Sequence, residues 1–164
     1  MRQLKTRLFS IKVCTRREQR FVRFLRMMLV SLTLEDAAKK EAENLRLSAE
    51  AMDALCRLMI DLKTLVPPLY ILAPSSGWVT TDELNLLTAL RGAKPGHIDG
   101  AATLLNVHAA RHLSLINLVI QAGQLIKGSD VVLGARPLMG DATDAQKIAP
   151  RSRKIDLGST ISAR

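Results

Sequence analysis

Residues 100–126 form the most apolar stretch of the chain, and their pattern predicts one long helix with a single formal charge, Arg111. Apolar residues and two histidines share one helical arc: Ile98, Ala101, Leu105, His108, His112, Leu115, Val119, Ala122 and Ile126. The opposite arc is polar but uncharged: Asn106, Ser114, Asn117, Gln121 and Gln124. A helix this apolar must be covered by protein, and amides in place of Lys and Glu predict a partly dry interface.

A second long helix is predicted from Thr33 to Val66. Thr33 is a suitable N-cap, and Pro67 ends the segment because proline cannot continue a helix. Its apolar residues have the spacing of a seam that packs against one antiparallel helix: Leu45, Met52, Leu55, Met59, Leu62 and Val66.

A short helix is predicted between the two long ones, after an ordered loop over residues 67–79. Thr80 and Glu83 have the spacing of a capping box, and Val79 and Leu84 that of a hydrophobic staple. Gly92 is a natural C-cap for this helix of residues 81–91. With 3% aromatic residues and no alternating β-branched run, the chain is predicted to be all-α: an antiparallel hairpin of two long helices with a short helix inserted between them.

Charge divides the chain into three parts. Residues 1–33 hold nine Lys or Arg against one Glu, residues 34–127 hold nine against ten acids, and residues 128–164 hold six against four. We therefore expect a basic N-terminal arm or mis-assigned leader over 1–33, with Met27 or Met28 as alternative starts. A helical domain over 34–127 and a flexible tail over 128–164 complete the predicted organisation.

The basic arm is one candidate binding element. Phe21 and Phe24 lie between arginines, as in segments that stack bases and contact phosphates. The nucleic-acid-binding candidates are Arg16, Arg17, Arg20, Arg23 and Arg26. The helix over 81–91 is too acidic to read DNA, because it contains Asp82 and Glu83 beside a single arginine.

Several function classes find little support. Cys14 and Cys56 form no disulfide or metal motif, which favours a reducing, cytoplasmic setting. No glycine-rich phosphate loop or positioned nucleophile is present, so we expect neither an enzyme nor a cofactor. The apolar run from Leu113 to Ile126 is too short to span a membrane.

The histidine pair is a further candidate. His108 and His112 are four residues apart on one predicted helical face, a spacing able to chelate zinc, and His97 lies close to the same azimuth eleven residues before His108. No carboxylate shares that arc, and Pro95 and Gly96 disturb the helix at His97. We therefore expect no metal site, and interpret the pair as neutral imidazoles inside a helix interface.

A family resemblance reaches over residues 34–127. The segment VHAARHLSLINLVIQAG, residues 107–123, resembles the second long helix of the TraM family of quorum-sensing antiactivators. Similarity to that family's first helix and its Leu-Pro exit is carried by Leu34, Glu35, Leu62, Leu65, Pro67 and Tyr70. The resemblance implies a hairpin that forms a homo-oligomer and sequesters a LuxR-type transcription activator.

Two functions follow as expectations, and a structural or secretion-associated helical subunit is a third possibility that the hydrophobic seam also fits. The first is a regulatory module that binds a protein partner through His108, Arg111, His112, Asn117, Gln121 and Gln124. The alternative is a nucleic-acid-binding accessory protein that acts through its Arg-rich N-terminal arm.

Overall fold

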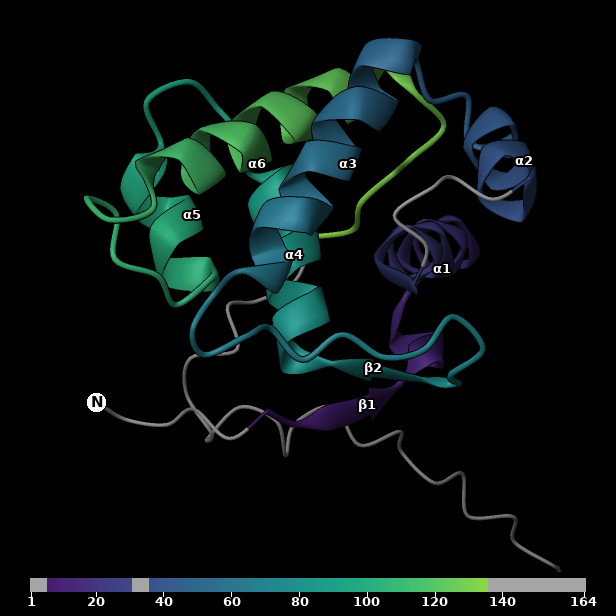
Figure 1. Cartoon of the computed structure of the whole chain (residues 1–164). Coiled ribbons are helices and arrows are strands. Elements are labelled where there is room, and N and C mark those ends of the chain that lie inside the picture. The colour runs from purple at the N-terminus through teal and green to yellow at the C-terminus, as the bar shows by residue number, and fades with distance from the viewer. Residues whose placement is uncertain (1–5, 31–35, 136–164) are drawn as a thin grey trace, which may run out of the picture.

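The computed structural model describes residues 6–30 and 36–135 (Figure 1). Within these residues the chain forms six α-helices, two 3-10 turns and a two-stranded antiparallel sheet. The elements in chain order are β1 (Leu8–Ser10), η1 (Ile11–Val13), α1 (Arg16–Val30), α2 (Asp36–Asn44), α3 (Ala49–Lys63), β2 (Trp78–Thr80), α4 (Thr81–Arg91), α5 (Ile98–Leu104), α6 (Leu113–Leu125) and η2 (Ile126–Gly128).

The predicted hairpin of two long helices is wrong, because both predicted helices are interrupted. The first is broken between α2 and α3, and the second between α5 and α6. Each break is a left-handed residue, Arg46 with φ 51° and Asn106 with φ 53°. The next residue's N–H then bonds back to the helix, from Leu47 to Ala42 O at 3.0 Å and from Val107 to Ala102 O at 3.0 Å. This is the Schellman pattern of helix termination, here made without glycine.

The expectation of an all-α chain is also wrong, because β1 pairs with β2. Phe9 lies opposite Val79 in this antiparallel ladder, which joins segments about seventy residues apart in sequence. Each strand has three residues. A strand of that length is too short to produce a detectable hydrophobic alternation, so the sequence pattern could not predict it.

Helix α1 belongs to the core. Phe21 and Phe24 are fully buried, with ring centroids 6.4 Å apart, and α1 packs against α2 and α3. The described part of residues 1–33 is therefore folded together with the rest of the chain, and not attached to it as a separate arm. A chain starting at Met27 or Met28 would lack this buried face.

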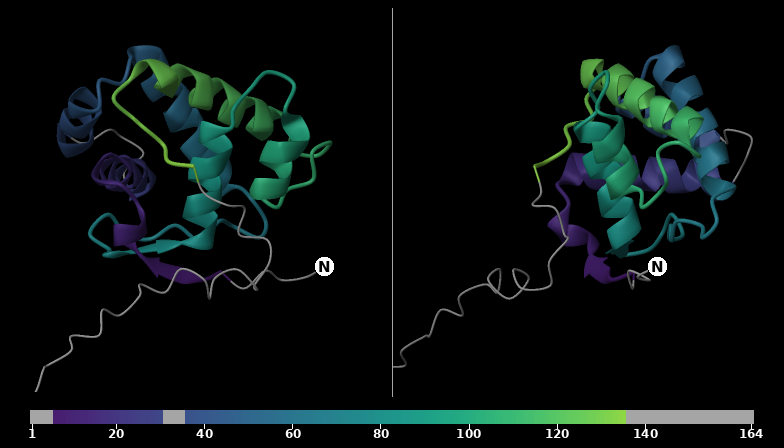
Figure 2. Two further views of the ribbon diagram at one scale, coloured as in Figure 1. Left: turned by 180° about the vertical axis from the view of Figure 1, so that it is seen from behind. Right: turned by 90° about the vertical axis from the view of Figure 1, so that its left-hand side faces the viewer.

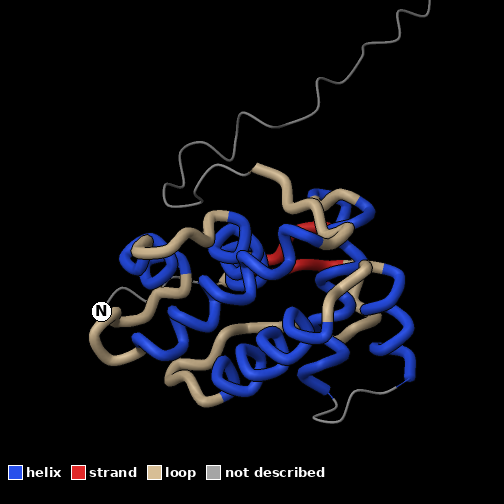
Figure 3. The backbone as a smooth tube through the Cα atoms, turned by 90° about the horizontal axis from the view of Figure 1, so that it is seen from above, coloured by secondary structure: helices blue, strands red, loops and turns tan. Residues whose placement is uncertain are grey.

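Helix α4 packs against α5 and α6, and Figures 2 and 3 show the fold from behind and from above. Helix α6 lies across α3 and α4 and also contacts α5. Gly123 allows the close crossing with α4, because a Cβ there would collide with Leu90 O and the Ala93 side chain. Short 3-10 and extended segments follow α6, and Asp130 N–H donates to Leu45 O at 2.9 Å. Most of the predicted tail, residues 136–164, lies outside the described residues.

The short-helix prediction is confirmed. Helix α4 spans Thr81–Arg91 with Thr80 as N-cap and Gly92 as C-cap. Glu83 N–H donates to Thr80 Oγ1 at 3.0 Å, and Thr80 N–H donates to Glu83 Oε2 at 2.9 Å. Val79 and Leu84 of the predicted staple are both buried.

Candidate nucleic-acid interface

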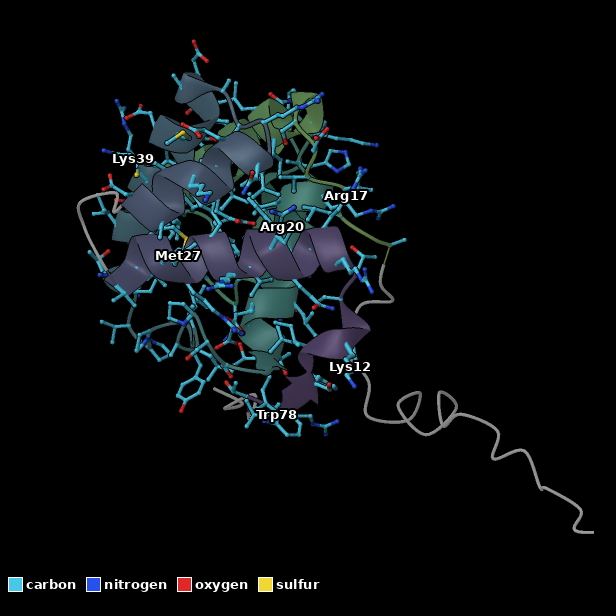
Figure 4. The ribbon with its side chains drawn as sticks, turned by 90° about the vertical axis from the view of Figure 1, so that its right-hand side faces the viewer. Lys12, Arg17, Arg20, Met27, Lys39 and Trp78 are labelled. Atoms are coloured by element: carbon cyan, nitrogen blue, oxygen red, sulfur yellow. The ribbon has the colours of Figure 1, made fainter. Side chains whose placement is uncertain are left out.

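The outward side of α1 and the preceding turn η1 carry a dense set of cations, here called the basic face. It consists of Lys12, Arg16, Arg17, Arg20 and Arg23, all exposed. Figure 4 views this side directly, with Lys12, Arg17 and Arg20 labelled, and Lys39 of α2 lies toward the Met27 end of α1. Helix α1 has one acidic residue, Glu18, and its side chain is buried. The outward side of the helix is therefore free of acids of its own.

Neighbouring acids neutralise little of the basic face. Arg20 forms an ion pair with Glu41 of α2, 2.8 Å from Nε to Oε1, and its side chain is still 52% exposed. Within the described residues no ion pair involves Arg16, Arg17 or Arg23. Several cations of the face thus remain open to an external anion.

The N-terminus of α1 is held in place by Glu18. Thr15 N–H donates to Glu18 Oε2 at 2.7 Å, and Glu18 N–H donates to Thr15 Oγ1 at 3.2 Å. This reciprocal pair is a capping box. The other carboxylate oxygen, Oε1, accepts from Gly134 N–H at 2.7 Å. One buried carboxylate therefore fixes both the first turn of α1 and the segment that follows η2.

The other end of α1 is anchored by a buried ion pair between Arg26 and Glu83. Arg26 Nε lies 2.6 Å from Glu83 Oε1, and Nη2 lies 2.8 Å from Oε2. The remaining guanidinium hydrogens reach the backbone oxygens of Ala73, Ser76 and Trp78. All five N–H donors of the arginine are thereby paired with an acceptor. Arg26 is thus a structural residue, in contrast to the binding role predicted for it.

Glu83 is equally well satisfied. Besides Arg26 it accepts from the N–H groups of Leu72, at 3.3 Å, and Thr80, at 2.9 Å. The pair ties α1 to the 70–80 loop and to the start of α4, which follow it by more than forty residues in sequence. A fully paired buried network of this kind sets the orientation of the elements it joins.

A second surface follows the turn before α6 and the outward side of α6 itself. Its exposed residues recur every three or four positions, as on one side of a helix: His108, Arg111, Ser114, Asn117, Gln121 and Gln124. We call these six residues the amide stripe. Five of them are among the six partner-binding residues predicted from the sequence, and the sixth predicted residue, His112, is half-buried. The structure therefore brings the predicted residues together, on the turn and α6, although the continuous helix that was to carry them is absent.

The histidines do not have the predicted environment. They lie in the turn between α5 and α6, where His108 O accepts from Arg111 N–H and His112 N–H at 3.0 and 3.1 Å. His108 is exposed, so the pair is not buried within a helix interface. No group of three or more His, Cys, Asp or Glu in residues 6–30 and 36–135 is arranged to hold a metal ion.

A cleft and a cysteine elsewhere in the fold lack the properties of a binding or catalytic site. A cleft of about 260 Å³ lies between α4, α6 and residues 129–133, but both of its cations face backbone oxygens. Arg91 Nε donates to Leu133 O, and Lys127 Nζ donates to Ala93 O.

Burial, followed by the charge of Asp53, raises the pKa of the Cys56 thiol, which keeps this cysteine protonated and unreactive near neutral pH.

Sequence reasoning missed the Arg26–Glu83 pair, because nothing local marks two residues 57 positions apart as partners. The amphipathic character of α1 was detectable, since Phe21, Phe24, Leu25 and Met28 recur at helical spacing.

None of the described helices is long and apolar enough to cross a bilayer. The chain matches no protein-family model, no curated protein and no solved structure.

Proposed function

We propose that this protein binds nucleic acid, with the basic face of α1 contacting the phosphate backbone. The observation that carries the proposal is the set of exposed arginines on a rigidly held helix whose only acid is turned inward. Cations placed in this way displace counterions from a phosphate backbone, which is the main source of sequence-independent affinity.

An anionic membrane is the rival ligand for such a face. Helices that lie in a membrane interface bury an apolar side among the lipids. The apolar side of α1 is already buried in the protein core through Phe21, Phe24 and Leu25. This arrangement favours nucleic acid over a lipid surface.

Sequestration of a LuxR-type activator is the other function expected from the sequence. That expectation depended on a hairpin of two long helices, which the fold does not contain. What supports binding through the turn and α6 is the exposure of the predicted residues. Exposure alone does not favour a protein over a nucleic acid as the occupant of this surface.

The test is the salt dependence of binding to a random-sequence duplex of about 20 base pairs, roughly two helical turns. Arg17→Gln/Arg23→Gln removes two unpaired cations from the basic face. The slope of log K against log salt concentration should become shallower by about 2. Lys63→Gln/Lys94→Gln is the matched control, since it removes two exposed cations that take part in none of the ion pairs of the described residues, and it should leave the slope unchanged.

Two outcomes would overturn the proposal. One is an equal effect of both double variants, because binding would then follow net charge and not the basic face. The other is retention of DNA affinity by the α1 variant together with loss of binding to vesicles rich in anionic lipid.

A further inference from the structure

The two-stranded sheet presents an exposed tryptophan beside the basic face. The chain has one tryptophan, Trp78 of β2, and its side chain is 56% exposed. Trp78 lies opposite Ser10 of β1, so the two side chains project from the same face of the ladder. Phe9 and Val79 project from the other face and pack against the core. The face that carries Trp78, Ser10 and the 55%-exposed Leu8 is therefore turned toward solvent.

The backbone of Trp78 is held by α1. Arg26 Nη2 of that helix donates to Trp78 O at 2.6 Å, and the same guanidinium pairs with Glu83. Trp78 N–H donates to Ser76 Oγ at 3.2 Å. The buried ion pair that anchors the basic face therefore fixes the position of this tryptophan as well, before a ligand arrives, which lowers the entropic cost of binding.

Cations lie at both ends of the short ladder. Backbone hydrogen bonds continue the ladder by one pair beyond each end of β1, to the residue before Lys12 and to Arg7 itself. Both of these cations are exposed. Figure 4 shows Trp78 on the same side of the molecule as Lys12, Arg17 and Arg20. The aromatic side chain and the basic face thus belong to one continuous surface.

We infer that this surface binds single-stranded nucleic acid, with an unpaired base stacked on the Trp78 indole and neighbouring phosphates on Lys12 and the arginines of α1. Every base has a π-face, so stacking of this kind tolerates any sequence. A duplex presents base faces only at its two ends, which makes a single strand the better ligand for this tryptophan. The inference rests on the proposed nucleic-acid binding and adds a preference for unpaired strands to it.

An anionic membrane is the rival ligand for this surface too. Leu8 and Trp78 are two apolar side chains beside the polar Ser10, and they give a bilayer little apolar area to bury. One exposed indole is enough for a stacked base. The surface therefore favours a nucleic-acid strand over a lipid surface.

A second exposed aromatic residue provides a matched control. The chain's one tyrosine, Tyr70, is 59% exposed, and its carbonyl oxygen accepts from Thr80 Oγ1 at 2.6 Å, at the end of β2. Tyr70 N–H donates to Asp82 Oδ2 at 2.8 Å. That carboxylate would repel a phosphate. Tyr70 therefore matches Trp78 in exposure but not in the charge of its surroundings.

The first measurement is the intrinsic fluorescence of the full chain, because its tryptophan emission comes from Trp78 alone. An oligo-dT strand of about 16 nucleotides should quench this emission in a saturable way, since a stacked base contacts the indole. A duplex of about 20 base pairs, held by the basic face, should leave the emission nearly unchanged.

The second measurement is the affinity for labelled oligo-dT, followed by fluorescence anisotropy at one salt concentration. Trp78→Ala should lower this affinity roughly 5- to 150-fold, and Trp78→Phe should recover part of the loss. Tyr70→Ala should leave the affinity unchanged, and circular dichroism should show that all three variants keep their helices.

Oligo-U serves as the ribose counterpart of oligo-dT. Trp78→Ala should weaken its binding by a similar factor, because stacking and phosphate contacts make no use of the 2′-hydroxyl group. The affinity of the unaltered chain for oligo-U relative to oligo-dT identifies the preferred sugar.

Three results would overturn the inference. They are binding of oligo-dT without quenching, an equal loss of affinity in Tyr70→Ala, and blue-shifted emission on vesicles rich in anionic lipid together with no response to the strand. The proposed function would survive each of them if Arg17→Gln/Arg23→Gln still made the salt slope of duplex binding shallower. Loss of that salt effect would instead contradict the proposed function, whatever the Trp78 variants do.

Discussion

The basic face and the amide stripe differ in the physics they can offer a ligand. The basic face is built from long cations with one inter-helix ion pair, Arg20 to Glu41. The stripe has one permanent cation, Arg111, among neutral hydrogen-bonding groups. Charge attracts phosphates from a distance and regardless of sequence, whereas neutral amides act only at contact.

The two surfaces also differ in how they are held. Helix α1 is fixed at its ends by buried carboxylates, Glu18 and Glu83, which accept hydrogen bonds from distant segments. Helix α6 is fixed by apolar packing and by the close approach at Gly123. A polar anchor fails when one partner is removed, while a packed anchor fails when volume is added. The supports can therefore be broken separately.

The largest effect is expected from Arg26→Met, which breaks the support of α1. The substitution leaves Glu83 as a buried charge without its cation, and breaking such a pair costs about 3–5 kcal/mol. A domain of this size has a total stability of about 5–15 kcal/mol, so the variant should be at the edge of unfolding. Urea denaturation followed by circular dichroism measures the loss.

The double variant Arg26→Met/Glu83→Gln serves as the control for this effect. It removes the buried charge along with its partner and should recover much of the lost stability. A double variant as unstable as the single one would show that the guanidinium contacts to backbone oxygens dominate.

A smaller effect is expected from Gly123→Ala, which breaks the support of α6. The added methyl group collides with Leu90 O and Ala93, and overpacking of this kind costs about 1–3 kcal/mol. The salt-dependent affinity of the basic face should persist, because α1 is held by other contacts. Gly100→Ala on α5 meets open space and should not destabilise the protein. Equal losses in the two variants would argue against a tight crossing.

The smallest effect is expected from Glu50→Gln, which lies on neither surface and sharpens the comparison. Backbone hydrogen bonding and then the Ser48 hydroxyl at the start of α3 lower the pKa of Glu50. Because the folded pKa lies below the unfolded one, the stabilisation is present near neutral pH and is lost as pH falls through the folded value. The difference in unfolding free energy between the unaltered chain and this variant should therefore vanish in acid, with DNA binding unaffected. A difference that grows on acidification would contradict this sign.

Local signals predicted α4 because each boundary is marked by the residue type that its geometry requires. Thr80 and Glu83 satisfy each other's backbone N–H groups, and Gly92 ends the helix. The predictions of two long helices failed for the opposite reason. Arg46 and Asn106 end their helices in a left-handed conformation. Glycine is the usual sequence signal for that conformation, and neither position has it. Ser48, which caps α3, marks a helix start inside the segment for which one continuous helix is predicted.

The candidate site was predictable in part. The amide stripe could be foreseen because helical spacing survives the break before α6. The cluster of arginines is evident from the sequence. The sequence does not show which of them are exposed and which are buried in an ion pair. Arg23 and Arg26 differ by three positions, and only the tertiary position of Glu83 separates a surface cation from a buried one.

The contacts of α1 also govern when the chain can fold. Its capping carboxylate, Glu18, accepts a hydrogen bond from Gly134 N–H, 116 residues later in the chain. Arg26 of α1 can pair only after Glu83 has been made. Helix α1, which is made before the other described helices, is thus among the last to acquire its full set of partners. Synthesis at about 5–20 residues per second leaves α1 without part of its contacts for several seconds before residue 134 is made. The arginines on its outward side keep that nascent segment charged and self-repelling, which opposes aggregation until the fold closes.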